Sequence, residues 1–158
     1  MRTVEGTQSA AGFRFAVVVS KYHDFVTDRL RAGALAALAA AGAHADDITV
    51  VRVPGAFELP LAARQAAASG GFDAIVCLGC LVKGATPHFE FIASAVAHGL
   101  TAASGDTLVP MAFGVLTTNS IEEALERATE GPSNKGWEAA SAAVEMATIS
   151  AALHVNVP

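Results

Sequence analysis

The strongest constraint on the fold is a regular alternation of short apolar runs with helix-forming segments. Four largely apolar runs are expected to form strands, over residues 13–20, 48–53, 74–81 and 108–116. Helices are expected between and after them, over residues 25–42, over residues 57–69, from Thr86–Pro87 onward, for a short stretch from Ser120, and over residues 134–153. Apolar strands that alternate with helices indicate a parallel sheet covered on both faces.

Local signals refine several of these boundaries. Thr86 followed by Pro87 predicts an N-cap residue and the first position of a helix. The Ser-x-x-Glu pattern of residues 120–123 is typical of a capping box. Pro110, near the start of the last strand, indicates a sheet edge or a bulge. The expected fold is therefore a doubly wound, three-layer α/β/α sandwich with a four-stranded, flavodoxin-like parallel sheet.

Size and charge narrow the class of protein. A chain of 158 residues suits one domain, residues 1–158, in which residues 1–11 form an N-terminal segment. A net charge of −5 does not supply the basic face that a general nucleic-acid binder needs. No run approaches the roughly 18 apolar residues of a membrane span, and the N-terminus lacks the apolar stretch of a signal peptide. We expect a soluble cytoplasmic protein that binds neither nucleic acid nor membranes.

Cys77 and Cys80 have the spacing of a redox motif but not its context. Both fall in a predicted strand, where residues three apart point to opposite faces and their Cα atoms lie about 10 Å apart, beyond the reach of a disulfide. A zinc site would need more ligands than these two thiols. We interpret both as small apolar strand residues, suited to a reducing compartment.

The loops that follow the strands are the candidate ligand site, because open parallel sheets bind ligands at the carboxyl ends of their strands. Much of the polar and aromatic character of the chain lies in these loops, at residues 21–25, 54–58, 83–88 and 114–119. Tyr22, Phe57 and Phe113 fall at predicted strand ends. Aromatic side chains there serve either as plugs of the core or as stacking surfaces for a ligand.

The third of these loops is the most informative. Residues 84–86 lead into a helix N-terminus, where free backbone amides and the helix dipole suit a phosphate; ordinary capping by Thr86 is the alternative. His88 follows in the first helical turn, where a neutral imidazole beside a phosphate could transfer protons, unless it is simply a surface histidine. Glu58 and Glu90 could orient this histidine or contact hydroxyl groups, or they could be solvated.

Arg127 and Lys135 flank the Gly131–Pro132 break before the last helix. They are either two solvated charges or a second phosphate-binding pair, contributed by this subunit or by its neighbour.

Four motifs taken together resemble the lumazine synthase family, which catalyses the penultimate step of riboflavin biosynthesis. The motifs occur in order at residues 53–60 (VPGAFELP), 84–89 (GATPHF), 112–118 (AFGVLTT) and 134–136 (NKG). The resemblance extends over nearly the whole chain. It implies a transferase that condenses 5-amino-6-(ribitylamino)uracil with 3,4-dihydroxy-2-butanone 4-phosphate, releasing phosphate and water, without a metal or organic cofactor.

The resemblance also assigns residues to the two substrates. It implies a pyrimidine and ribityl pocket lined by Tyr22, Ala56, Phe57, Glu58, Leu81, Val82 and Lys83. Tyr22 would stack on the ring, and Glu58 would contact ribityl hydroxyls. The butanone phosphate would be bound by Ala85, Thr86 and Arg127, while His88 would move protons. In this family, four side chains reach the site from an adjacent subunit: Phe113, which joins the pyrimidine pocket, the phosphate-binding Arg127, and the supporting residues Lys135 and Glu138.

Assembly follows from the same resemblance, which implies a homo-pentamer and riboflavin synthase as a protein partner. Whether twelve pentamers close into a 60-subunit icosahedral shell stays open, because residues 129–133 lack a lysine that is common in shell-forming members. Residues 3–6 are expected to add an edge strand to a neighbour's sheet. A second departure is His23, which stands where the family usually has Asn.

Two other functions compete with the enzyme. A paralogue could hold a flavin or lumazine without turnover, but it would not need both His88 and Arg127. A purely structural shell protein would not need polar groups gathered at one rim.

Overall fold

The computed structural model describes residues 1–154, which form strands and helices in the expected alternating order. The strands are β1 (Phe15–Ser20), β2 (Ile48–Val53), β3 (Ala74–Val82) and β4 (Met111–Thr118). The helices are α1 (Asp24–Ala40), α2 (Leu59–Ala68), α3 (His88–Thr107), α4 (Ile121–Glu126) and α5 (Lys135–His154), with short 3-10 turns η1 (Ala45–Asp47) and η2 (Ala56–Glu58). All four strands are parallel, in the order β2-β1-β3-β4, which confirms the flavodoxin-like sheet.

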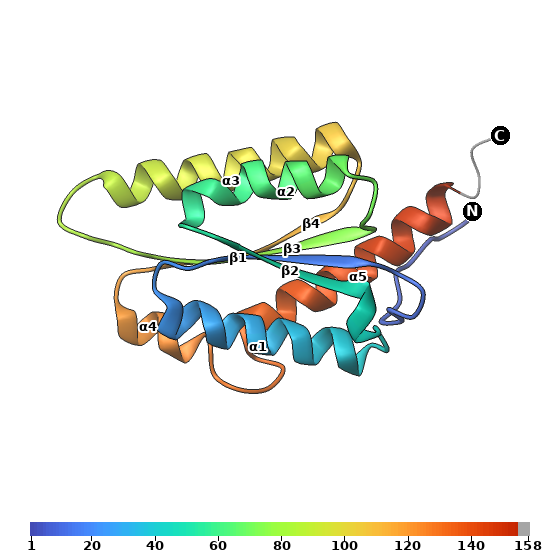
Figure 1. Cartoon of the computed structure of the whole chain (residues 1–158), viewed down its shortest axis with the longest axis horizontal. Coiled ribbons are helices and arrows are strands. Elements are labelled where there is room, and N and C mark those ends of the chain that lie inside the picture. The colour runs from blue at the N-terminus through green and yellow to red at the C-terminus, as the bar shows by residue number, and fades with distance from the viewer. Residues whose placement is uncertain (155–158) are drawn as a thin grey trace.

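The sheet is the middle of three layers (Figure 1). Helices α2 and α3 cover one face, and α1, α4 and α5 cover the other. The central strand β1 shows why both faces are apolar: Phe15, Val17 and Val19 point into the core beneath α1 and α5, whereas Ala16 and Val18 point into the core beneath α2. Every residue of β1 is buried, as the continuous apolar run predicts.

Strands β2 and β4 are the two edges of the sheet. Pro110 directly precedes β4, and its carbonyl accepts a hydrogen bond from the Ile75 N–H at 2.8 Å. Since proline is tolerated where a strand needs no second hydrogen-bonding neighbour, the edge position inferred from Pro110 is confirmed. Within residues 1–154 the outer side of each edge strand has no paired strand, so both edges offer backbone groups to another chain.

Of the two predicted helix N-caps, the one for α3 is wrong and the one for α4 is confirmed. The N-cap position of α3 is Pro87, and no side chain caps the helix, so the prediction that Thr86 is the N-cap is wrong. The near-helical backbone of Pro87 shifts the start past the threonine. Ser120 does cap α4, because its Oγ accepts the Glu123 N–H at 3.2 Å. The Glu123 carboxylate accepts the Asn119 N–H at 2.9 Å, one residue before the position that a capping box requires.

The two cysteines lie on opposite faces of β3, as predicted. Both thiols are unpaired and buried, Cys77 in the core beneath α2 and Cys80 in the core beneath α1. Burial raises the pKa of Cys77 to about 12 and that of Cys80 to about 11, because the low-dielectric interior disfavours a thiolate.

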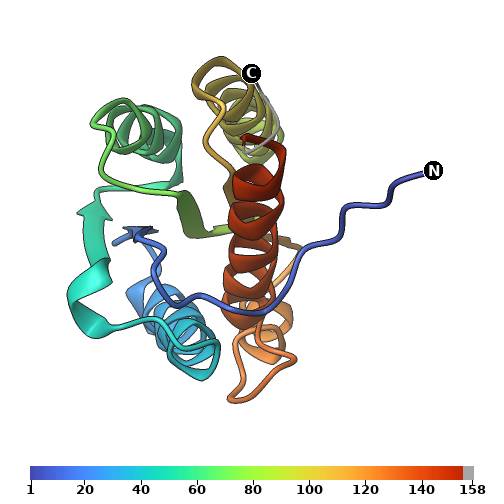
Figure 2. The ribbon, with the colours of Figure 1, turned by 90° about the vertical axis from the view of Figure 1, so that its right-hand side faces the viewer.

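The N-terminal segment crosses α5 and then projects away from the other elements (Figure 2). The Thr7 N–H donates to the Thr148 Oγ1 at 2.9 Å, and the Gln8 amide donates to the Ser141 carbonyl at 3.2 Å. These contacts attach residues 7 and 8 to this chain's own last helix. Of the helices within residues 1–154, none has the length and apolar character needed to cross a membrane.

Candidate functional site: two separate pockets

A cleft of about 630 Å³ opens at the carboxyl ends of β1, β2 and β3, where ligand sites of parallel sheets are expected. The loops after these three strands supply most of its walls, and α4 contributes Ile121. Eight residues assigned from the sequence line this cleft: Tyr22, Ala56, Phe57, Glu58, Leu81, Val82, Thr86 and His88. The structure therefore brings together assigned residues from the loops after three different strands and from the first turn of α3.

Two aromatic side chains stand open to solvent in the cleft. Tyr22 is 66% exposed and Phe57 is 62% exposed, although such rings are usually buried. The backbone fixes the Tyr22 loop, since its N–H donates to the Pro54 carbonyl at 3.2 Å. Ala56 lines the same cleft and is buried, and its small side chain leaves space above it for a ligand. Exposed flat rings in a preformed cleft suit a planar heterocycle better than a role as core plugs.

Glu58 fixes the second loop of the cleft. Its Oε2 accepts the Gly55 N–H at 2.9 Å, a bond that closes the short turn η2. The bond engages one carboxylate oxygen and holds the side chain in the cleft wall. A carboxylate held in this way suits the hydroxyl groups of a polyol chain.

His23 lines the same cleft in an uncommon backbone conformation, with φ 55° and ψ 50°. Its ring meets Tyr22 edge-on, with ring centroids 4.4 Å apart, and Phe25 at 5.8 Å. Partial burial lowers the pKa of His23 below its ordinary value of 6.5, because the desolvated imidazole disfavours the charged form. This cleft therefore contains a second imidazole in addition to His88.

The N-terminus of α3 faces the cleft through Gly84, Thr86 and His88. Because no side chain caps this helix, the amides of its first turn stay open to an anion, as an unsatisfied helix start leaves them. Lys83 lies outside the cleft: its N–H donates to the Thr118 carbonyl at 2.9 Å, and its Nζ lies 3.9 Å from the Glu90 carboxylate. Ala85 does not line the cleft either.

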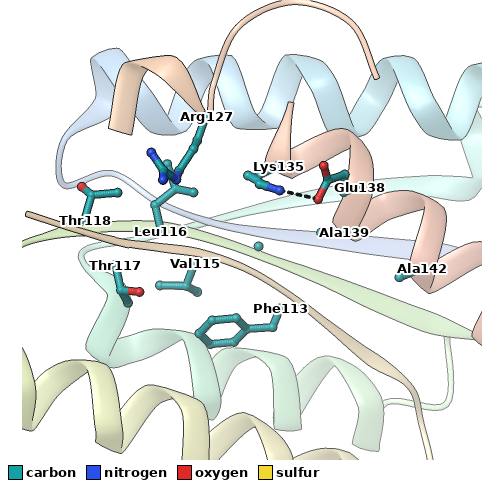
Figure 3. Close-up of a pocket in the computed structure, with 11 residues that line it drawn as sticks. Phe113, Val115, Leu116, Thr117, Thr118, Arg127, Lys135, Glu138, Ala139 and Ala142 are labelled. Atoms are coloured by element: carbon teal, nitrogen blue, oxygen red, sulfur yellow. Dashed lines mark hydrogen bonds and ion pairs between the residues drawn. The ribbon is translucent and has the colours of Figure 1, made fainter. Parts of the chain in front are cut away.

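A second pocket, of about 410 Å³, lies between β4, the end of α4 and the start of α5 (Figure 3). We call it the edge pocket because β4 is an edge strand. The remaining four residues assigned from the sequence line it: Phe113, Arg127, Lys135 and Glu138. Neither pocket contains any residue of the other.

The charges of the edge pocket are held in place by short contacts. The Arg127 Nη1 donates to the Glu123 carbonyl at 2.9 Å, and the Lys135 Nζ lies 2.8 Å from the Glu138 Oε2 (Figure 3). Within residues 1–154, no carboxylate forms a salt bridge with Arg127, whereas Glu138 pairs with Lys135. The guanidinium is therefore the cation of this pocket that is available to a phosphate.

Phe113 corrects one expectation. It was expected at the carboxyl end of its strand, but β4 extends to Thr118 and Phe113 is its third residue. The strand begins three residues later and ends two residues later than predicted, because Leu81 and Val82 of β3 pair with Thr117 and Thr118. Phe113 is 48% exposed on the open sheet edge, away from the rim where Tyr22 lies.

The sequence analysis assigned no role to Asn134, which joins the edge pocket to the helices behind it. A local signal existed, because Asn directly before a helix is a common N-cap.

The residues that line the two pockets do not form a metal site. Within residues 1–154, no three His, Cys, Asp or Glu side chains gather as metal ligands would.

Comparison with known proteins adds an independent line of argument. Residues 12–151 match the family model described as 6,7-dimethyl-8-ribityllumazine synthase. A protein of that name from Syntrophus aciditrophicus (strain SB) is 54% identical over 142 residues, which cover 90% of this chain and 92% of the relative. Another of the same name, from Desulfatibacillum aliphaticivorans, is 46% identical over 149 residues, which cover 94% of this chain and 96% of the relative.

Proposed function

The chain belongs to the 6,7-dimethyl-8-ribityllumazine synthase family, and we propose that its active site combines the cleft of one subunit with the edge pocket of the next. The chain has lumazine synthase activity in riboflavin biosynthesis. One observation carries the shared site: the residues assigned to the reaction divide into two pockets of the same chain that have no residue in common. Each pocket alone lacks part of the necessary chemistry.

The cleft is the half that binds 5-amino-6-(ribitylamino)uracil. The exposed ring of Tyr22 stacks on the pyrimidine, and Glu58 accepts hydrogen bonds from ribityl hydroxyls. Leu81 and Val82 line the edge of the ring. The assignment of Lys83 to the uracil edge stays a prediction: its N–H is bonded to the Thr118 carbonyl and its Nζ lies 3.9 Å from the Glu90 carboxylate.

The edge pocket of the neighbour is the half that completes the phosphate site. The open amides of α3 and the Arg127 guanidinium converge on the phosphate of 3,4-dihydroxy-2-butanone 4-phosphate. Phe113, exposed on the open edge of β4, covers the bound pyrimidine from the neighbour's side. Two subunits thus surround substrates that neither encloses alone.

His88 is the proton-transfer group of this site. The uracil amine attacks the ketone to form an imine and release water, and phosphate elimination and ring closure then require protons to be moved. An exposed imidazole in the first turn of α3 lies where the phosphate binds and can take up or release a proton at a ring nitrogen. Holding both substrates in one geometry contributes the rest, since proximity makes the condensation effectively intramolecular.

The shared site requires an oligomer, and we propose a pentamer. Each subunit would offer its cleft to one neighbour and its edge pocket to the other, a head-to-tail contact that closes into a ring. The unpaired edges β2 and β4 and the exposed Phe113 supply surface for such contacts. The two unpaired cysteines are in keeping with work in the reducing cytoplasm.

Direct assay tests this function. Purified protein is incubated with both substrates while lumazine fluorescence and released phosphate are followed, with each substrate alone as the control. We expect lumazine and phosphate to appear in equal amounts. Tight binding of lumazine without turnover would contradict the proposal and identify a binding protein, and full activity in a particle of monomer mass, measured by light scattering, would contradict the shared site.

A further inference from the structure

The Asn134 amide is a buried polar group with every strong hydrogen-bonding position occupied. The residue is only 1% exposed. Its Nδ2 donates to the Arg29 carbonyl at 3.2 Å and to the Thr129 carbonyl at 2.9 Å. Its Oδ1 accepts the N–H groups of Gly136 at 2.8 Å and Trp137 at 3.2 Å. One side chain therefore joins α1, the segment after α4, and the first turn of α5.

The packing around this amide leaves no room for adjustment. A Cβ atom at Gly33 of α1 would overlap the Asn134 side chain, and one at Gly136 would overlap the Leu30 carbonyl. Glycine at both positions lets α1 and α5 approach at backbone distance, with the amide held between them. Because buried packing of this kind transmits displacements, a change at Asn134 moves the start of α5 relative to α1.

The same region fixes the cations of the edge pocket. The Lys135 N–H donates to the Arg127 carbonyl at 2.9 Å, so the backbones of the two cationic residues are bonded directly. The Glu138 N–H donates to the Asn134 carbonyl at 3.0 Å, and the Glu138 carboxylate holds the Lys135 ammonium. Asn134 is therefore bonded directly to Glu138, and it is connected to Arg127 through the backbone of its neighbour Lys135.

We propose that Asn134 is a positioning residue for phosphate binding: its amide sets the place of Arg127 by fixing the segment between α4 and α5 against α1. This inference rests on the proposed function, in which Arg127 pairs with the substrate phosphate. A helix cap alone would engage only the Oδ1 acceptor. The two bonds from Nδ2 reach outside α5, and they give the residue its second role.

Two uncharged substitutions separate the helix cap formed by Oδ1 from the two hydrogen bonds donated by Nδ2. Asn134→Ala removes both functions, whereas Asn134→Ser keeps an N-cap oxygen but cannot donate to two carbonyls on different segments. We expect Asn134→Ala to raise the KM for the butanone phosphate roughly tenfold and to leave the KM for the pyrimidine within about twofold, as expected when one charge-assisted contact is displaced. Asn134→Ser should recover much of the lost stability while keeping the raised phosphate KM.

The decisive test is a double-mutant cycle with Arg127→Ala, run beside the stability control Ala63→Gly. Ala63 is buried in α2, in the opposite layer, and lines neither pocket. In the Arg127→Ala background, Asn134→Ala should raise the phosphate KM no further while still lowering the free energy of unfolding. Ala63→Gly should lower that free energy without raising the phosphate KM.

Three results would overturn the inference, and they are distinguishable. If Asn134→Ala and Asn134→Ser leave the phosphate KM unchanged while Arg127→Ala raises it, Asn134 is only a helix cap and the proposed site survives. If the effects of Asn134→Ala and Arg127→Ala on KM are additive, Asn134 acts by another route. If Arg127→Ala itself leaves the phosphate KM unchanged, the assignment of Arg127 fails, and this inference fails with it.

Discussion

The cleft and the edge pocket are built by different means. The cleft consists of loops after three parallel strands, and its binding surface is exposed rings and backbone, with Tyr22 and Phe57 largely solvent-accessible. The edge pocket lies between strand β4 and the ends of two helices, and its charged side chains, which come from the helix ends, are held by hydrogen bonds of 2.8 to 2.9 Å. A flat apolar ring needs an open face, whereas an anion needs a cation that is oriented before it arrives.

The same difference explains why neither pocket is sufficient. The cleft contains the imidazole of His88 and the open amides of α3 but no arginine, and the edge pocket contains Arg127 but no histidine. Placing one against the other brings together the stacking surface, the proton-transfer group and the phosphate cation.

The largest expected effect is in the cleft. His88→Ala should lower kcat roughly ten- to a thousandfold, because general acid–base catalysis contributes on that order while the condensation still proceeds slowly without it. The matched control is His98→Ala, a histidine of the same helix that lines neither pocket. Steady-state kinetics on both variants checks this. An unchanged kcat for His88→Ala would remove this residue from the mechanism.

The next effect belongs to the edge pocket and should be selective. Arg127→Ala removes a charge-assisted contact to phosphate, worth about 1.5 to 3 kcal/mol, so the KM for the butanone phosphate should rise roughly ten- to a hundredfold. The KM for the pyrimidine should change far less. Arg64→Ala is the control, since Arg64 pairs with Asp106 in the opposite layer. Equal increases for both substrates would mean that the two pockets do not divide the substrates between them.

The smallest expected effect is the contribution of His23, in the cleft, to the pH dependence of the free energy of unfolding. Its pKa is lowered by partial burial, so below about pH 6.5 the unfolded chain binds this proton more readily than the folded chain. The contribution of His23 to stability is complete above that pH and is lost as pH falls through the lowered pKa. His23→Asn should therefore lose slightly less stability than the parent chain on acidification. Urea unfolding midpoints from pH 7 to 5 test this, and parallel curves would contradict it.

Much of the fold could be predicted from the sequence because its signals are local. Apolar strands such as β1 and β3 and the stop signals after the helices specified the alternation and the layers. The position of the proline before β4 indicated the sheet edge. Predictions that depended on the exact end of an element were wrong. The N-cap of α3 is Pro87 and not Thr86, and Phe113 lies inside β4 because the pairing of β3 with β4 continues to Thr118.

The division of the site was harder to predict from residues alone. The resemblance to the family implied which side chains act in the reaction and which come from an adjacent subunit, but their separation into a cleft and an edge pocket of one chain depends on which strand lies at the sheet edge. The role of Asn134 depends on contacts with Arg29, which is 105 positions away in the sequence. Such contacts are properties of packing between layers, and no local pattern encodes them.

The shared active site is tested most directly by combining two impaired chains and assaying them at a butanone phosphate concentration well below the raised KM of the Arg127→Ala variant. His88→Ala and Arg127→Ala subunits, carrying different tags, are co-expressed, and particles that contain both are purified and assayed. A site made from the cleft of one subunit and the edge pocket of the next predicts recovery of activity, with roughly a quarter of the sites intact when the chains mix evenly. Activity no higher than that of the two variants measured separately would mean that each site is built within one chain, and would contradict the account.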